Sequence, residues 1–224
     1  MPIPHSTAVA HLGRACPEMK ALIRRVGPCA LQIETGRTPF QALVSAVAHQ
    51  QLHGKAAQTI LGRYRQLFGG RFPGPKALAS VTDDQLRGAG FSRAKTAAIR
   101  DLAEKTISGV VPGAKAIAAL TDEEIIARLT TVRGVGKWTV DMLLIFTLGR
   151  PDVWPVDDFG VRSGWKIAHG LDEMPSPKEL QALGENSARI ARLPPGISGA
   201  PPILPACRSD FAVTRLKLPA PFFQ

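Results

Sequence analysis

The sequence predicts an all-α protein over residues 15–185, and three features of the chain support this expectation. Ser or Thr recurs with Glu or Gln three positions later, a pattern in which two side chains cap the first turn of a helix. Apolar residues follow at intervals of three and four, as at Leu61, Tyr64, Leu67 and Phe68. No stretch shows the sustained alternation of a half-buried β-strand, so helices are expected to supply the whole core.

Paired capping residues mark four expected helix starts along the chain. They are Thr38 with Gln41, Thr82 with Gln85, Thr121 with Glu124, and Ser176 with Glu179. Glycine suits the residue after a helix, because it adopts the left-handed conformation without steric cost. Glycines close most of the expected segments, at Gly69, Gly70, Gly109, Gly149 and Gly170.

The composition is that of a globular protein with a polyanionic partner. Of the 224 residues, 45% are apolar, enough to bury the core of one domain or of two small ones. The formal net charge of +10 favours binding to nucleic acid, because each phosphate that is neutralised releases counterions. The longest apolar stretch, residues 142–148, is far too short to span a bilayer, and the N-terminus lacks the pattern of a leader. We therefore expect a protein that is not secreted, in the cytoplasm of a bacterium or the nucleus of a eukaryote.

Cysteine usage gives no sign of a structural cross-link. Cys16, Cys29 and Cys207 are an odd number at unrelated spacings. Such a set predicts neither a disulfide framework nor a zinc site, so no metal site is expected.

The two ends of the chain lack the helical pattern. Residues 1–14 carry no readable motif and are expected to be an N-terminal extension. Residues 186–224 contain seven prolines and no apolar periodicity, so we expect an irregular tail there.

A hairpin of two helices is expected at about residues 121–148. Residues 121–131 and 137–148 have helical patterns, and the connection between them contains Gly134 and Gly136, where backbone must turn tightly or approach a ligand. The second helix would present backbone N–H groups at its N-terminus, a natural anchor for a phosphate. A tight turn between helices, with no ligand, is the alternative that two glycines alone leave open.

Two carboxylates follow the hairpin. Asp157 and Asp158 come at the end of a loop that contains Trp154 and Pro155, directly before a segment with a helical pattern, residues 159–169. A carboxylate at that position caps a helix or takes part in chemistry.

These motifs, in this order, resemble the helix-hairpin-helix DNA glycosylase superfamily and, within it, the branch that releases 3-methyladenine and other alkylated bases. The resemblance covers about residues 10–185 and indicates the compact, single-core form. It implies two helical layers with a DNA-binding cleft between them, in which an extruded nucleotide is received. It rests on residues 48–57, on the series Leu129, Gly134, Gly136, Trp138, Thr139, and on Pro155, Asp157, Asp158.

The resemblance assigns DNA contacts to two segments. Leu52 matches the residue that wedges into the duplex, and Gln51 and His53 lie beside it. A buried Leu52, a surface His53 and a structural Gln51 are the alternatives that remain open. The hairpin residues that match the grip on the DNA backbone are Gly134, Gly136, Lys137 and Thr139.

Asp158 matches the catalytic carboxylate of the family. An N-glycosidic bond breaks through an oxocarbenium-like sugar, so a nearby carboxylate stabilises positive charge and orients or deprotonates the attacking water. Extruding a base costs roughly a few kcal/mol, which favours damaged and weakly paired bases. Asp157 is expected instead to be a helix cap or a surface charge.

The resemblance also indicates a base pocket and a reaction class. Trp138, Met142 and Phe159 match positions that line the pocket, where an aromatic face attracts a cationic alkylated base. Trp154 and Trp165 are expected to pack in the core. Relatives that also cut the strand carry a Schiff-base lysine where this chain has Trp138, so a monofunctional hydrolase is expected.

No cofactor is expected, and the expected partner is double-stranded DNA that contains damaged bases, bound by a monomer. The four spaced cysteines of iron-sulfur relatives are absent from the sequence. Carbonyl groups of the hairpin could still hold a monovalent cation. Two other functions remain open: a non-catalytic helix-hairpin-helix module, which would need no carboxylate at Asp158, and a glycosylase for uracil or mismatched bases.

The C-terminal segment departs from the family. Relatives continue after residues 183–185 with a last helix rich in Trp and Tyr, whereas proline-rich sequence follows here. Codons can be chosen for residues 188–201 so that another frame spells Pro-His-Arg-Ser-Val-Ala-Ala-Trp-Tyr-Leu-Trp-Arg-Ala, which resembles that helix. We therefore expect that residues 186–224 arise from a single-base loss in the gene, and that the shifted tail leaves apolar surface uncovered and lowers stability and activity.

Overall fold

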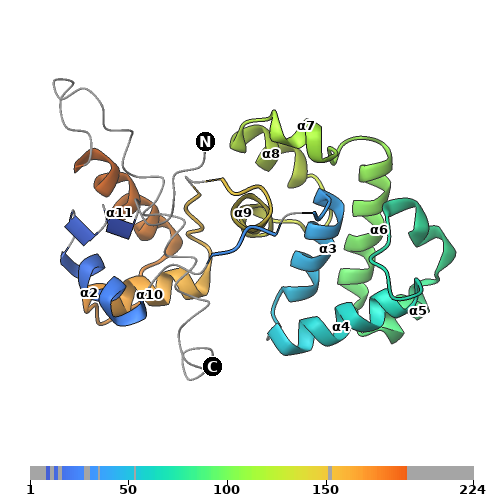
Figure 1. Cartoon of the computed structure of the whole chain (residues 1–224), viewed down its shortest axis with the longest axis horizontal. Coiled ribbons are helices and arrows are strands. Elements are labelled where there is room, and N and C mark those ends of the chain that lie inside the picture. The colour runs from blue at the N-terminus through green and yellow to red at the C-terminus, as the bar shows by residue number, and fades with distance from the viewer. Residues whose placement is uncertain are drawn as a thin grey trace. The chain divides into compact units, whose positions relative to one another are not determined.

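The described part of the chain is helical throughout. The computed structural model describes residues 9–10, 13–14, 17–27, 31–34, 36–52, 54–150 and 153–190, and no β-strand occurs among them, which confirms the all-α expectation. The chain divides into two compact units (Figure 1). Unit 1 comprises Met1–Ile33 and Gly149–Gln224, and unit 2 comprises Glu34–Leu148.

Unit 2 carries the greater number of the described helices. They are α3 (Pro39–His49), α4 (Gly54–Gln66), the 3-10 helix η1 (Pro75–Ser80), α5 (Asp83–Gly88), α6 (Arg93–Ile107), α7 (Ala114–Ala118), α8 (Asp122–Leu129) and α9 (Lys137–Phe146). Helix α3 packs against α4, α6 and α9. Its side chains Phe40, Leu43, Val44 and Val47 are at most 2% exposed. Full burial of such a side chain contributes roughly 1.5–3 kcal/mol, so α3 forms the centre of this core.

The four helix starts expected from sequence are confirmed. Capping boxes with both hydrogen bonds begin α3 at Thr38, α5 at Thr82 and α8 at Thr121. In unit 1, Ser176 exchanges the same two bonds with Glu179. Hydrogen bonds from Ser176 lower the pKa of Glu179, which keeps this capping carboxylate ionised. Each box satisfies two backbone N–H groups that a helix start otherwise leaves without a partner.

An aromatic cluster ties α4 to the segments that follow it. Tyr64 is completely buried, and its ring lies edge-to-face with Phe68, Phe72 and Phe91 at centroid distances of 5.3, 5.6 and 5.5 Å. Burial raises the pKa of Tyr64, so the phenol is neutral at any physiological pH.

Unit 1 contains α2 (Pro17–Val26), α10 (Phe159–His169) and α11 (Pro177–Ile190), and α10 packs against α2. Trp154 and Trp165 are buried and lie edge-to-face at 5.8 Å, which confirms that both pack in the core. The indole Nε1 of Trp154 donates to the Leu180 carbonyl at 3.0 Å and so fixes α11.

Helix boundaries differ from the sequence expectation in two places. Helix α11 continues to Ile190, so the expectation of an irregular chain from residue 186 is wrong for residues 186–190. These five residues contain no proline, and the helix continues through them because nothing breaks it. The two helices of the hairpin, α8 and α9, are each shorter than expected. Residues 191–224 lie outside the described residues, and within the described part no helix is long and apolar enough to cross a membrane.

Gly184→Ala is expected to lower the free energy of unfolding by about 1–3 kcal/mol, because overpacking forces neighbouring groups apart. A Cβ at Gly184 would lie 2.5 Å from Nε1 of Trp154, the atom that holds α11. Thermal unfolding measures the effect. Gly62→Ala is the matched control in a helix, because a Cβ there meets nothing within 4 Å and alanine favours the helix. Equal unfolding temperatures for Gly184→Ala and the unmodified chain would contradict this packing.

Candidate functional site

The hairpin turn of unit 2 requires glycine at its first position. Gly134 has φ +71°, and a Cβ there would lie 3.1 Å from the Cβ of Ala98 on α6. The left-handed backbone and the close neighbour both disfavour a side chain. Gly134 therefore sets the course of the chain from α8 into α9.

Gly136 has a different environment. It is the N-cap of α9, with φ −90° and ψ 174°, and the helix has no side-chain capping hydrogen bond at this end. A Cβ at Gly136 would meet nothing within 4 Å. Neither the backbone conformation nor the packing requires glycine here. Because glycine has no side chain, a ligand can approach the N-terminus of α9 closely. That terminus carries a partial positive charge, which suits an anion.

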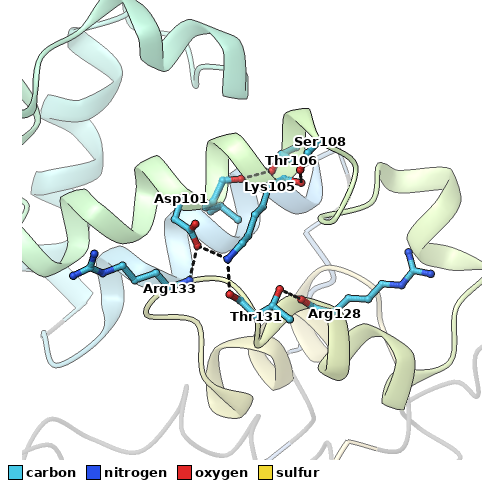
Figure 2. Close-up of polar contacts among 8 residues, drawn as sticks. Asp101, Lys105, Thr106, Ser108, Arg128, Thr131 and Arg133 are labelled. Carbon is cyan, nitrogen blue, oxygen red and sulfur yellow. Dashed lines mark hydrogen bonds and ion pairs between the residues drawn. The ribbon is translucent and has the colours of Figure 1, made fainter.

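Helix α6 braces the hairpin turn through two charged side chains (Figure 2). The carboxylate of Asp101 accepts from the backbone N–H of Arg133 at 2.6 Å and from Lys105 Nζ at 2.9 Å. Lys105 Nζ also donates to the Thr131 carbonyl at 2.5 Å. Although desolvation opposes it, the hydrogen bonds from Arg133 and Lys105 lower the pKa of Asp101. The carboxylate is therefore ionised at neutral pH and holds the turn as a charge-assisted acceptor.

Gln50 links the hairpin to the end of α3. Its Nε2 donates to the Gly134 carbonyl at 2.9 Å and to Oγ1 of Thr139 at 3.0 Å. Thr139 is only 2% exposed. Its hydroxyl accepts this bond inside unit 2, and a contact between Thr139 and DNA stays a prediction.

The loop after α3 presents Leu52 to solvent. Gln51 has φ +56° and is the one non-glycine residue with positive φ in the part of the chain that the structure describes. Leu52 follows it, 40% exposed, so the alternative of a buried Leu52 is wrong. Gln51 is also exposed, and its backbone shapes the loop. His53 lies outside the described residues, and its role stays a prediction.

Lys95 of α6 binds backbone carbonyl groups at the end of α3, where the same loop begins. Its Nζ donates to the Ala48 carbonyl at 3.0 Å and to the Gln50 carbonyl at 2.8 Å. Burial lowers the pKa of Lys95. A cation suits the C-terminal end of a helix such as α3, where carbonyl groups lack partners.

The first turns of α9 hold the other residues predicted for DNA or base contact in unit 2. Lys137 Nζ pairs with the carboxylate of Asp141 at 2.8 Å, and Asp141 is 1% exposed. Lys137 thus neutralises a buried charge on its own helix, and a further contact to DNA stays a prediction. Trp138 and Met142 are half-buried, one turn apart on α9.

Unit 1 holds the predicted catalytic carboxylate. Asp158 is the N-cap of α10, and its Oδ1 accepts from the backbone N–H of Val161 at 3.0 Å. The residue is 2% exposed. The helix N-terminus stabilises its negative charge and fixes its orientation. Asp157 is exposed, which confirms a surface charge, and Phe159 is 51% exposed at the start of α10.

The structure groups most predicted residues in unit 2 and places Asp158 and Phe159 in unit 1. Sequence reasoning missed the residues that hold the loop and the hairpin: Gln50, Lys95, Asp101 and Lys105. Apart from the ion pair between Asp101 and Lys105, which are four residues apart, their contacts join segments up to 89 residues apart, so no local pattern could have revealed those contacts. Among the described residues, no group of three or more His, Cys, Asp or Glu could hold a metal ion.

Comparisons with known proteins find one family model and several similar chains. The model of the HhH-GPD superfamily of base excision DNA repair proteins matches residues 44–189. DNA-3-methyladenine glycosylase 1 of Schizosaccharomyces pombe is 39% identical over 171 residues, which cover 75% of this chain and 75% of that protein. The solved structure of the S. pombe 3-methyladenine DNA glycosylase in complex with abasic DNA matches with a TM-score of 0.77 and 37% identity, over 81% of this chain and 89% of that one. A DNA-3-methyladenine glycosidase from Bacillus halodurans matches with a TM-score of 0.70 and 31% identity, over 95% of this chain and 89% of that one.

Proposed function

Because the chain belongs to the HhH-GPD superfamily of base excision DNA repair proteins, we propose that it is a DNA glycosylase that releases alkylated purines from double-stranded DNA. The reaction is hydrolysis of the bond between C1′ of the sugar and the base, carried out by a monomer that leaves the strand intact. The substrates proposed are 3-methyladenine and 7-methylguanine.

The hairpin and the loop after α3 supply the grip on DNA. A phosphate at the N-terminus of α9 is attracted by the helix dipole and by backbone N–H groups, and Gly136 leaves room for its approach. The exposed Leu52 enters the gap that the extruded nucleotide leaves in the base stack. The net charge of +10 strengthens the attraction of the chain to the DNA backbone at low salt.

Asp158 supplies the negative charge for the chemical step. As the C1′–N bond lengthens, its electron pair leaves with the base and positive charge grows on the sugar. A buried carboxylate stabilises that charge more strongly than one in water, and it orients the water that adds to C1′. The proton of that water passes to the carboxylate or to solvent.

The base pocket proposed from Trp138, Met142 and Phe159 favours a cationic base. A 7-methylguanine or 3-methyladenine base carries a formal positive charge, which an aromatic face attracts by about 0.5–2 kcal/mol. Such a base leaves without prior protonation, so one carboxylate suffices. The absence of a lysine at position 138 supports hydrolysis without a Schiff base.

The observation that carries the proposal is the buried carboxylate of Asp158, fixed at the start of α10 in a chain that also has the hairpin. A module that only binds DNA has no need of it. The test is release of free base from methylated duplex DNA, with uracil-containing and mismatched duplexes in parallel. Release of 7-methylguanine supports the proposal; release of uracil alone assigns the chain to the deaminated-base class, and DNA binding without any release assigns it to the binding modules.

We further infer that residues 186–224 are read from a shifted frame; the family model matches only the first four of them. Replacing these residues with the ending that the alternative frame encodes is expected to raise the unfolding temperature, because a last helix rich in Trp and Tyr would cover apolar surface. Thermal unfolding of the two proteins checks this. A gene sequence whose codons do not permit the alternative translation would refute the inference.

A further inference from the structure

The backbone at the end of α3 leaves the helical conformation at Gln50 and Gln51. Helix α3 ends at His49, Gln50 has φ −55° and ψ 127°, and Gln51 turns into the left-handed region at φ +56°. The Leu52 N–H donates to the His49 carbonyl at 3.3 Å. A non-glycine residue in that conformation is strained, so the loop needs other contacts to keep this conformation.

Lys95 supplies two of these contacts. Its ammonium bridges the Ala48 carbonyl inside α3 and the Gln50 carbonyl just beyond it, at 3.0 and 2.8 Å. Helices α3 and α6 pack against each other, and the two lie in unit 2 (Figure 1). The ammonium group of Lys95 therefore binds carbonyl groups on both sides of His49, the residue at which α3 ends.

The position of Lys95 on its own helix is unfavourable for a cation. It lies in the first turn of α6, where Ser92 caps its backbone N–H at 3.3 Å. The partial charge at a helix N-terminus repels a cation, and burial adds a further cost. The two hydrogen bonds to carbonyl groups at the C-terminal end of α3 offset these costs.

We propose that Lys95 is a positioning residue for base extrusion, which holds the exit of α3 so that Leu52 stands ready to enter the duplex. This inference rests on the proposed glycosylase function. The side chain of Gln50 binds the Gly134 carbonyl and so joins the same loop to the hairpin that is proposed to grip the DNA backbone. Lys95 thus acts through Leu52 and touches neither base nor sugar.

A double-mutant cycle tests the proposal. Lys95→Met, Leu52→Ala and the double variant are compared in single-turnover release of 7-methylguanine from duplex DNA. Each single variant is expected to be slower by about tenfold, and the double variant no slower than Leu52→Ala, because residues that act through one another are not additive. Lys95→Arg keeps the charge and the donors and should restore most of the rate. Lys76→Met is the matched control, since Lys76 is an exposed lysine of η1 in the same unit.

Two further measurements separate positioning from general destabilisation. Release from methylated single-stranded DNA should be unchanged in Lys95→Met, because no base has to leave a stack. Multiplied losses in the double variant, or an equal loss on single strands, would overturn the proposal. If Lys95→Met does not fold, Lys95→Gln takes its place in the cycle.

A measurement of base unstacking distinguishes this inference from the proposed function. Fluorescence of 2-aminopurine at the target position of a duplex reports unstacking without any bond cleavage. If the unmodified chain releases no base, the glycosylase proposal fails, and the fluorescence alone decides the role of Lys95. An equal rise in fluorescence for Lys95→Met and the unmodified chain would refute the positioning role of Lys95.

Discussion

Asp158→Asn is expected to slow release of 7-methylguanine from duplex DNA on the order of a hundredfold or more, the usual cost of removing one electrostatic contact to a transition state. The variant should still fold and bind DNA. Asparagine caps a helix about as well as aspartate, so its side-chain oxygen can keep the bond from the Val161 N–H that now fixes α10. The change thus removes the negative charge and keeps the local structure.

Single-turnover kinetics on DNA with one 7-methylguanine, together with thermal unfolding, measure the two effects separately. Asp157→Asn is the matched control, because Asp157 is the adjacent, exposed carboxylate and carries the same charge. It should change the rate less than about twofold, as screened surface charges do. Asp158→Ala should lose both the charge and the cap, with a loss of stability of about 0.5–2 kcal/mol. A rate for Asp158→Asn equal to that of the unmodified chain would remove Asp158 from the mechanism.

The sequence was most informative where structure depends on neighbours along the chain. The capping boxes at Thr38, Thr82 and Thr121 were predictable because each joins residues three positions apart, and Gly134 was predictable because its turn is short. Asp157 and Asp158 were harder to separate, since either of two adjacent carboxylates can begin a helix. The structure assigns the cap to Asp158 and leaves Asp157 on the surface.

Contacts between distant segments were beyond sequence reasoning. Gln50 and Gln51 are adjacent and chemically identical, yet in the structure the side chain of Gln50 binds the hairpin, whereas Gln51 has the left-handed backbone. Lys95 reads as an ordinary surface lysine near the start of a helix. Its partners lie 45 and 47 residues away, and only the packing of α3 on α6 brings them together.

Gly134→Ala is expected to lower stability and Gly136→Ala to weaken DNA binding, although the two glycines are only two residues apart. Gly134→Ala should lower the free energy of unfolding by about 1–3 kcal/mol, because alanine is strained at φ +71° and its Cβ would press on Ala98. Gly136→Ala should leave stability unchanged or slightly raised, because its φ of −90° suits any residue and its surroundings are open. Thermal unfolding ranks the two variants.

Affinity for DNA should rank these two glycine variants in the opposite order to stability. A methyl group at Gly136 stands where a phosphate would meet the N-terminus of α9, so we expect the Kd of Gly136→Ala for duplex DNA to rise by about tenfold at fixed salt. Gly134→Ala, measured at a temperature at which it is folded, should bind more nearly as the unmodified chain does, since its methyl group faces α6. Binding by Gly136→Ala as tight as that of the unmodified chain would show that the start of α9 is not the phosphate anchor, and the grip on DNA would then have to come from other basic residues of unit 2.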